Sequence, residues 1–363
     1  MTGHSAASTL SPQGRQLDVL VVTNMYPSAD APHRGVFVRD QVRALQRRSD
    51  VNIELFTFDP GLTEYPRALR ELRRRYRDQR FDIVHAHFGL TAWPALCARL
   101  GPVAVTLHGN DLLHPRSRLI TRAALPFSAL PAPVSRAFSD LVPGAGETRR
   151  VAILPCGIDL ERFKPIPRRQ ARAHLGLDPD EPCLLFPHDP GRSLKRFDRA
   201  QEAAGGVRLL TLGSVDPLEV PYWHNAANAV LVPSQTEGFG LAVIEASACD
   251  VPAFGTPVGI HPVVLGDIEG SLCAPWDPAV WRGALQAPLA QSDPRVQGRQ
   301  AAELFSAERM AARMVAAWHA LVDQQQPQPR QRRAMAALRE KRSRETVYSA
   351  VAEESTSASS ERA

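Results

Sequence analysis

The segment LDVLVVTNMYP, residues 17–27, indicates the fold class of this chain. Its first six residues are mostly aliphatic, and a loop signal that ends in proline follows them. Short apolar runs of this kind are typical of parallel strands that are buried on both faces of a sheet. The residues after the loop place Val38, Val42 and Leu45 at helical spacing. A buried strand followed by a helix predicts an α/β fold built on a parallel sheet.

The alternation of short apolar strands and helices occurs twice, and the linker Phe163–Pro167 separates the two runs. Because 363 residues exceed one ordinary hydrophobic core, we expect two Rossmann-like domains, residues 17–165 and 166–323. The N-terminal residues 1–16 and the basic tail 324–363 are expected to be disordered. The expected strands are 17–22, 52–58, 81–87, 103–109, 183–188, 207–213, 229–233 and 251–256, and the expected helices are 36–48, 69–80, 92–100, 193–204, 240–249 and 301–322.

Composition argues against several kinds of protein and site. Five cysteines are scattered along the chain and never stand in C-x-x-C spacing, which argues against a disulfide framework and a zinc site. The polar N-terminus lacks the apolar core of a signal peptide, and no run approaches the roughly 18 apolar residues of a transmembrane helix. We therefore expect a cytoplasmic protein.

The formal net charge of +5 has three interpretations. Much of the basic excess lies in residues 67–80 and in the tail between Arg330 and Arg342. A solvated helix face and a disordered tail are the simplest interpretation. The sharper alternative is a peripheral contact with anionic lipid headgroups at the inner face of the membrane. Nucleic acid is not expected as a partner, because no aromatic residues interleave with the basic ones.

The segment PSQTEGFGLAVIEA, residues 233–246, is the main candidate ligand site. It follows an expected strand and opens an expected helix, where ligands of open α/β sheets bind. Gly238 and Gly240 would let a ligand approach the backbone, and free N–H groups at the helix start suit phosphate or sugar oxygens. Gly238 and Glu245 are seven positions apart, so a helix would place them on one face, roughly 10 Å apart. One extended ligand would then contact both.

The two acidic residues of this segment also have structural interpretations. Glu237 could be a negative charge that complements a helix N-terminus. Glu245 could be a surface glutamate, but its neighbours are apolar or small, and a carboxylate in such a helix needs a partner. We favour a functional role for both residues.

The string E-G-F-G-L-A-V-I-E-A, residues 237–246, followed by A-C-D-V-P, closely resembles the E-x7-E signature of the retaining family 4 glycosyltransferases of bacterial type. The resemblance covers most of residues 17–320. It implies the GT-B fold, in which the parallel sheets of two Rossmann-like domains face a central cleft. Five further strings match in order and spacing: T-N-M-Y-P with P-H-R-G-V-F-V-R, H-A-H-F-G-L, L-H-G-N-D, L-P-C-G-I-D-L-E-R-F-K-P and G-R-S-L-K-R.

The resemblance implies an activity: metal-independent, retaining transfer of a sugar from a nucleotide-diphosphate sugar to a hydroxyl acceptor. The acceptor would be a glycan, a lipid-linked molecule or a small metabolite. No cofactor is implied beyond the donor substrate itself. The donor phosphate would help to deprotonate the acceptor on the same face of the sugar, and no separate protein base is assigned.

The resemblance also implies roles for the donor-side residues. Arg192 and Lys195 would grip the diphosphate, because two fixed cations can replace a metal as the leaving group gains charge. A surface position at a helix start is the alternative for both. Glu245 would hydrogen-bond the ribose, and Glu237 would contact the donor sugar. Further donor contacts would come from Gly238, Phe239, Gly240 and Leu241.

Three residues of the N-terminal half complete the expected site. His108 would face the transferred sugar from the end of a strand, although a lone histidine is more often structural. Gly35 would let the first loop approach the phosphates. Asp111 is a weaker candidate for the acceptor side.

The chain departs from the family pattern at two places and contains one misleading motif. Asp250 stands where glycine is frequent, but Asp can still adopt the left-handed conformation at a helix C-terminus. Residues 259–263 replace a frequent G-G-x-P-E pattern, which puts contacts near the nucleotide in doubt. Asp178-Pro179-Asp180 spells the metal-binding D-x-D motif but precedes a strand and contains proline, so we expect a turn.

Other functions fit parts of the sequence. A nucleotide-sugar epimerase of the same fold would share the cleft but resemble residues 237–245 less. A phosphorylase would need a pyridoxal-bearing lysine, and two of the three lysines lie in the linker or the tail. A non-catalytic nucleotide-binding protein would be expected to lack Arg192, Lys195 or one of the glutamates.

Overall fold

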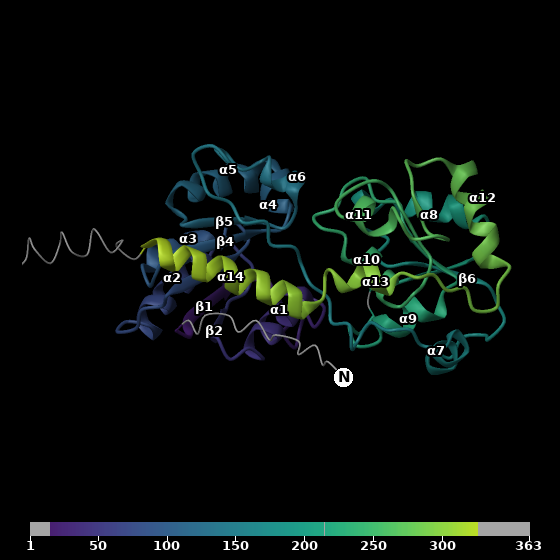
Figure 1. Cartoon of the computed structure of the whole chain (residues 1–363), viewed down its shortest axis with the longest axis horizontal. Coiled ribbons are helices and arrows are strands. Elements are labelled where there is room, and N and C mark those ends of the chain that lie inside the picture. Colours follow the sequence, from purple (N-terminus) through teal and green to yellow (C-terminus); the bar gives the residue numbers. More distant parts are fainter. Residues whose placement is uncertain (1–14, 214, 326–363) are drawn as a thin grey trace, which may run out of the picture. The chain divides into compact units, whose positions relative to one another are not determined.

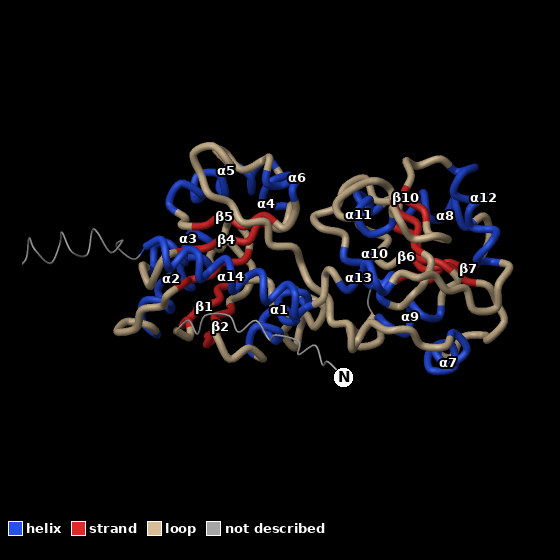
Figure 2. The backbone as a smooth tube through the Cα atoms, viewed as in Figure 1, coloured by secondary structure: helices blue, strands red, loops and turns tan. Residues whose placement is uncertain are grey.

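The computed structural model describes residues 15–213 and 215–325, which form two parallel five-stranded sheets with helices around each (Figures 1 and 2). The expected α/β class, with one parallel sheet in each half of the chain, is confirmed. Every expected strand is present, with ends that shift by up to two residues.

The first sheet has the strand order β2-β1-β3-β4-β5. The central strands β3 and β4 are buried at every position, as a sheet covered on both faces requires. The edge strand β5 reads LPAP, and its two prolines suit an edge because proline cannot donate to a neighbouring strand. The strands are β1 Leu17–Thr23, β2 Val51–Thr57, β3 Ile83–His87, β4 Val103–Leu107 and β5 Leu130–Pro133.

The helices of the first half differ from expectation at two places. The basic helix α2 covers Glu64–Arg75, not residues 69–80, because Glu64 starts it and Tyr76 leaves the helical conformation. The sequence pattern missed every element between residues 110 and 155. Two four-residue helices and a proline-rich strand there are too short to show a period, and the ten-residue helix Pro115–Ala124 was missed as well. The helices are α1 Val36–Gln46, α2 Glu64–Arg75, α3 Ala92–Ala98, α4 Asn110–Leu113, α5 Pro115–Ala124, η1 Leu125–Phe127 and α6 Arg136–Ser139.

The second sheet has the order β10-β9-β8-β6-β7, and its central strands β6 and β8 are fully buried. Its strands are β6 Cys183–Phe186, β7 Arg208–Thr211, β8 Ala229–Val232, β9 Ala253–Gly255 and β10 Leu272–Cys273. Its helices are α7 Arg168–Leu175, η2 Ser193–Lys195, α8 Phe197–Ala204, α9 Val220–Ala226, α10 Leu241–Ala248, α11 His261–Leu265, α12 Pro278–Leu289, α13 Arg299–Glu303 and α14 Ala307–Gln325. The sequence pattern missed α7, α9, α11, α12 and β10.

Two expected helices of this half are shorter than predicted. The helix expected over 193–204 is divided at Arg196, which has a left-handed conformation (φ 57°) and separates η2 from α8. The helix expected from residue 240 begins at Leu241, because Gly240 has φ 103°. Gly238 therefore lies in a loop, and the prediction that it shares a helix face with Glu245 is wrong.

Two turn predictions are confirmed. Asp250 follows α10 with φ 55°, the left-handed conformation expected of it. Its carboxylate accepts the backbone N–H groups of Gly298 and Arg299 at 3.0 and 2.8 Å, which a glycine could not do. Asp178 forms a turn in which its carboxylate accepts the N–H groups of Asp180 and Glu181.

The last helix, α14, contacts the first half through Trp318, whose indole N–H donates to Nδ1 of His85 on β3 at 3.0 Å. In the described part of the chain, no helix combines the length and apolar character that a membrane span needs. The predicted disordered segment 1–16 falls almost entirely, and the basic tail from residue 326 wholly, outside the described residues.

Candidate active site

Glu237 lies in the loop between β8 and α10, at the carboxyl end of a central strand. Its carboxylate is held from both sides, by the Ser234 hydroxyl at 2.7 Å and by the Lys195 ammonium at 2.5 Å. The Lys195 and Glu237 side chains are only 10% and 5% exposed, so this is a buried ion pair. Removing such charges from water is costly, which makes stability alone a poor explanation for the pair.

The two basic candidates occupy different environments. Burial lowers the pKa of Lys195, although Glu237 opposes that shift. Arg192 is the residue that precedes η2, and within residues 15–213 and 215–325 no carboxylate pairs with its guanidinium. Both side chains line one pocket, where Arg192 is the cation still available to an anionic ligand.

His188 is a neighbour of Glu237 that sequence analysis missed. It follows β6, and its Nε2 lies 3.8 Å from a carboxylate oxygen of Glu237. Burial lowers the pKa of His188 well below its usual range, and the nearby Lys195 and Arg192 cations lower it further. His188 is therefore neutral beside the ion pair. A histidine just after a strand end was the only available sequence signal.

The two glycines of this loop make room for neighbouring protein atoms, whereas the sequence led us to expect that they make room for a ligand. A Cβ on Gly238 would lie 2.2 Å from the backbone oxygen of His108. A Cβ on Gly240 would lie 2.8 Å from the ring of His261, and its φ of 103° also favours glycine. These glycines thus allow close approach of protein atoms, while Gly238 also lines the pocket.

Phe239 does not reach the pocket with its side chain, which is buried and packs edge-on against Phe305. Its backbone oxygen accepts the N–H of Ile260, so this loop is fixed on the segment that follows β9. Among the described residues, the N–H groups of Phe239 and Gly240 have no backbone acceptor outside regular elements. These two N–H groups are therefore available for the hydrogen bonds to the transferred sugar that the family resemblance implies.

Glu245 faces the pocket from α10. It lies one helical turn after Leu241, and these two residues share a face because side chains four apart are neighbours on a helix. Its side chain is 20% exposed, and the fully buried His224 on α9 has Nε2 at 3.5 Å from its carboxylate. Neither ring nitrogen of His224 has a hydrogen-bond partner among the described residues. His224 thus lies near Glu245 without a hydrogen bond to it, and the carboxylate that was expected to need a partner stays open to a ligand.

His108 follows β4 and lines the same pocket from the first half of the chain. Its ring packs against Phe37 and Phe88, and Nε2 lies 3.0 Å from Nδ1 of His87. Burial lowers the pKa of His108 well below its usual range, and the neighbouring histidines His87 and His85 lower it further. His108 is therefore a neutral imidazole.

Asp111 holds the backbone of the His108 loop. It is 3% exposed, and its carboxylate accepts the N–H groups of His108 and Gly109 at 3.1 and 2.7 Å. It does not line the pocket, so the structure gives no support to an acceptor-side role. Its function is to fix the turn that presents His108.

Gly35 starts α1 with φ 61°, and a Cβ there would lie 2.1 Å from the backbone oxygen of Met25. This glycine lets the loop after β1 fold against itself while it lines the pocket. Gly35 was predicted from the sequence, but its neighbours His33 and Arg34, which also line the pocket, were not. Their signal was the P-H-R-G string, of which only the glycine was interpreted.

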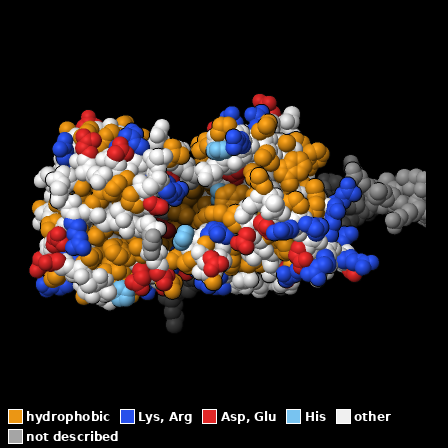
Figure 3. Space-filling view, turned by 180° about the vertical axis from the view of Figure 1, so that it is seen from behind, with side chains coloured by type: hydrophobic (Ala, Val, Ile, Leu, Met, Phe, Trp, Pro, Cys, Tyr) orange, Lys and Arg blue, Asp and Glu red, His pale blue; other side chains and the backbone are white. Residues whose placement is uncertain are grey.

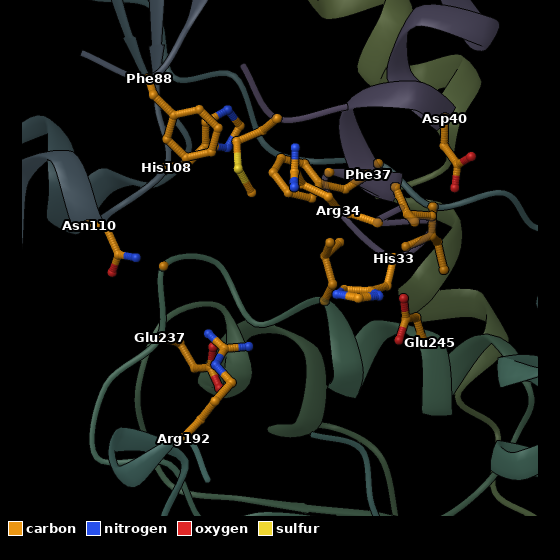
Figure 4. Close-up of a pocket in the computed structure, with 18 of the residues that line it drawn as sticks. His33, Arg34, Phe37, Asp40, Phe88, His108, Asn110, Arg192, Glu237 and Glu245 are labelled. Atoms are coloured by element: carbon orange, nitrogen blue, oxygen red, sulfur yellow. The ribbon is translucent and has the colours of Figure 1, made fainter. Parts of the chain in front are cut away.

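One pocket of about 740 Å³ brings these groups together, a volume in the range of small-molecule sites. Figure 4 shows His108 and Phe37 on one side, with Arg192 and Glu237 on the other. The face in Figure 3 is hollowed near its middle, with histidine side chains at the edge of the hollow. The predicted residues that line this pocket are Gly35, His108, Arg192, Lys195, Glu237, Gly238, Leu241 and Glu245.

A second ion pair lies at the wall of this pocket. Arg162 contacts Asp40 at 2.8 Å, with side chains 19% and 10% exposed, and both residues line the pocket.

No group of three or more His, Cys, Asp or Glu side chains is arranged to hold a metal ion within the described ranges.

Both halves of the chain match known families. Residues 7–162 match the glycosyltransferase family 4 profile, and residues 190–304 match the glycosyl transferases group 1 profile. A D-inositol 3-phosphate glycosyltransferase from Segniliparus rotundus is 30% identical over 216 residues. That match spans 48% of this chain and 48% of the relative, so the chain spans about half the length of this relative.

Solved structures share the fold at low sequence identity. Sucrose-phosphate synthase from Thermosynechococcus elongatus superposes with a TM-score of 0.65 at 21% identity, over 85% of this chain and 99% of that one. Anabaena Alr3699/HepE, in complex with UDP and glucose, gives 0.62 at 16% identity, over 84% and 100%. These likenesses show the GT-B fold, and the two family matches show that the chain belongs to the family 4 glycosyltransferases.

Proposed function

We propose that this protein transfers a sugar from a nucleotide-diphosphate sugar to a hydroxyl acceptor, with retention of configuration and without a metal. The observation that carries the proposal is the meeting of four kinds of group in one pocket. These are the cation Arg192, the Lys195–Glu237 pair, the carboxylate of Glu245 and the neutral ring of His108.

The charges fit a diphosphate leaving group. As the glycosidic bond to the donor breaks, negative charge grows on the phosphate oxygens, and fixed cations nearby lower the barrier. Arg192 can supply two parallel hydrogen bonds to a phosphate, and Lys195 adds a point charge that Glu237 holds in place. These two residues are proposed to act on the diphosphate.

The carboxylates and the loop would orient the rest of the donor. Glu245 is proposed to accept hydrogen bonds from the ribose hydroxyls, since it lies on α10 away from the loop. Glu237 is proposed to contact the sugar, together with the free N–H groups of Phe239 and Gly240. His108 is proposed to meet the same sugar from the opposite wall (Figure 4).

Retention follows if the acceptor attacks from the face that the leaving phosphate occupies. The phosphate oxygen then takes the acceptor proton, the acceptor oxygen forms the new glycosidic bond, and the old bond to phosphate breaks. The charged groups would stabilise the oxocarbenium-like transition state between these events. No protein side chain is assigned as a base.

The named relatives suggest which substrates to test first. The Anabaena structure holds UDP and glucose, so a UDP-linked hexose is our proposed donor. The Segniliparus relative is named for D-inositol 3-phosphate, so an inositol phosphate is the first acceptor to test among small metabolites, glycans and lipid-linked molecules.

Contact with anionic lipid stays a prediction, as does the cytoplasmic location. Figure 3 shows Lys and Arg side chains gathered toward one end of the face that it presents. On α2, however, several arginines are already paired with carboxylates, including Arg67 with Glu64 and Arg74 with Glu71. Such pairs reduce the net positive charge available to lipid.

The test is a panel of nucleotide sugars with candidate acceptors, in the presence of EDTA. We expect a UDP-hexose to raise the melting temperature, and UDP release to depend on the acceptor. NMR of the product should show the anomeric configuration of the donor. Conversion of the donor that does not depend on an acceptor would indicate an epimerase, and failure of every nucleotide sugar to bind would overturn the proposal.

Glu245→Ala sharpens this test. Loss of hydrogen bonds to a charged group is worth about 1.5–3 kcal/mol, so the donor KM should rise roughly 10- to 100-fold with little change in kcat. A donor with 2′-deoxyribose should bind to the unaltered protein more weakly than the normal donor does. Its affinity for the Glu245→Ala variant should be the same as its affinity for the unaltered protein. Glu202→Ala, which removes an exposed glutamate of α8, is the matched control and should change neither constant.

A further inference from the structure

Gln41 is a buried polar residue of α1 whose side chain points at the histidines behind the pocket. It is 5% exposed, and its amide nitrogen lies 3.3 Å from Nε2 of His87, which is fully buried on β3. The other ring nitrogen of His87, Nδ1, lies 3.0 Å from Nε2 of His108. A line of three side chains thus runs from α1 to the wall of the pocket.

The two histidine rings are arranged for an in-plane hydrogen bond. Their planes differ by 19°, and their centroids are 5.3 Å apart. That separation is close to the 3.0 Å N···N distance plus the two ring radii, so the rings meet edge to edge and not face to face. An N–H of one ring therefore points directly at the bare nitrogen of the other.

Each ring carries one proton. Burial lowers the pKa of His87 to about 3 and lowers that of His108 well below its usual range, so both are neutral near pH 7. A neutral imidazole has one donor nitrogen and one acceptor nitrogen. Whichever group fixes the first ring in such a line also fixes the second.

We propose that Gln41 and His87 are positioning residues that set the tautomer of His108. The amide N–H of Gln41 donates to Nε2 of His87, so His87 holds its proton on Nδ1 and donates it to Nε2 of His108. His108 must then hold its own proton on Nδ1.

The free end of this line is open to the pocket. Nδ1 of His108 has no partner among the described residues, and it is absent from the buried unpartnered atoms. His108 therefore presents an N–H donor to the pocket that it lines. If the protein has the proposed function, this N–H donates to a hydroxyl oxygen of the transferred sugar. An unprotonated nitrogen at the same place could only accept a hydrogen bond from that hydroxyl.

His85 provides an internal reference with the opposite tautomer. Its Nδ1 accepts the indole N–H of Trp318 at 3.0 Å, so its proton is on Nε2 and donates to the Thr106 hydroxyl at 2.6 Å. His85 and His108 are thus expected to differ in the ring nitrogen that carries hydrogen, although both are neutral.

The first experiment reads the tautomers by two-bond ¹H–¹⁵N correlation NMR of the full chain, with His108 assigned from a His108→Asn spectrum. We expect the proton on Nδ1 in His108 and on Nε2 in His85. Gln41→Glu should reverse His108, because a carboxylate only accepts and would draw the His87 proton to Nε2. A His108 proton on Nε2 in the unaltered protein overturns the proposal, whether or not the protein proves to use a UDP-sugar.

The second experiment measures steady-state kinetics with Gln41→Met, which removes the amide but keeps the length of the side chain. Loss of one oriented donor lowers kcat by roughly 10²-fold, and the donor KM should stay nearly constant. Gln46→Met makes the same change at an exposed position of this helix; it is the matched control and should leave kcat unchanged. An unchanged kcat in a folded Gln41→Met protein also overturns the proposal.

Discussion

On one side of the pocket, His108 is a neutral ring held by His87, and on the other side Lys195 and Glu237 form a buried ion pair. The first arrangement depends on which nitrogen carries a proton, and the second depends on full charges on two buried side chains. Both positions lie just beyond the ends of parallel strands or in the loops that follow them.

The difference suggests that the two sides of the pocket suit different parts of the donor substrate. A diphosphate carries formal charge, and the cations on the C-terminal side can stabilise it. Sugar hydroxyls carry none, and an oriented neutral donor can bind them without competing for the phosphate. Variants that alter one side at a time therefore either separate the two sides or show that they act alike.

The largest effect is expected from the ion pair. Lys195→Met should lower kcat/KM by roughly 10³-fold, because a fixed cation is lost near the leaving group. It also leaves Glu237 buried without its cation, so the free energy of unfolding should fall by about 3–5 kcal/mol. Activity assays and denaturant unfolding report these two changes separately.

The double variant Lys195→Met/Glu237→Gln distinguishes function from stability. It removes both charges together, so it should regain most of the lost stability but none of the activity. If the double variant recovered activity, the pair would serve only the fold, and the charge difference between the two sides would have no catalytic meaning.

Acid should weaken the histidine side. Burial lowers the pKa of His87 to about 3 from a usual value of 6.5, so the unfolded chain binds the proton between these pH values. The free energy of unfolding should therefore fall as the pH drops below 6.5, by about 1.4 kcal/mol per pH unit for this residue. Its share of the loss should reach about 2 kcal/mol at pH 5.

His87→Gln isolates that share in chemical denaturation between pH 7 and 5. Other buried histidines, including His85 and His188, shift in the same direction, so the unaltered protein should show a steeper slope. Over this pH range the variant should lose about 2 kcal/mol less than the unaltered protein. Equal slopes in both proteins would mean that His87 is protonated as easily in the fold as in the unfolded chain.

The side of the pocket that the C-terminal half forms, its C-terminal wall, was the easier one to predict, because its residues are close in sequence. Glu237 and Glu245 lie in one segment that follows a strand, so the position of the strand placed both near a cleft. The resemblance to a family supplied Arg192 and Lys195 as well. Their proposed roles remain predictions, but the structure brings all four residues to one pocket.

The N-terminal wall could not be assembled in this way. Gln41 and His87 are 46 residues apart and belong to a helix and a strand, and their contact depends on how these elements pack. Sequence analysis named His108 but had no means to find what holds it. The same limit applies to the contact of His224 with Glu245, which joins two helices.

Glycines were misread for a related reason. A glycine after a strand signals close approach, but not what approaches. At Gly238 the space of a side chain is taken by the His108 backbone oxygen, and at Gly240 by the His261 ring. Local sequence predicts the conformation of such a loop better than it predicts the neighbour that requires it.

The smallest effect is expected at Asp250, which lies outside the pocket and tests whether the C-terminal wall depends on its support. Asp250→Ala removes a side chain that accepts two backbone N–H groups at the start of α13, and should cost about 1 kcal/mol of unfolding free energy. Asp250→Gly loses the same hydrogen bonds, but glycine adopts the left-handed conformation without the cost of about 1 kcal/mol that other residues have. The unfolding free energy of this variant should therefore be nearly unchanged. Melting curves should therefore rank glycine above alanine, while kcat stays unchanged in both. Since both variants lack the hydrogen bonds, the reverse order would show that the left-handed conformation at this position costs alanine little.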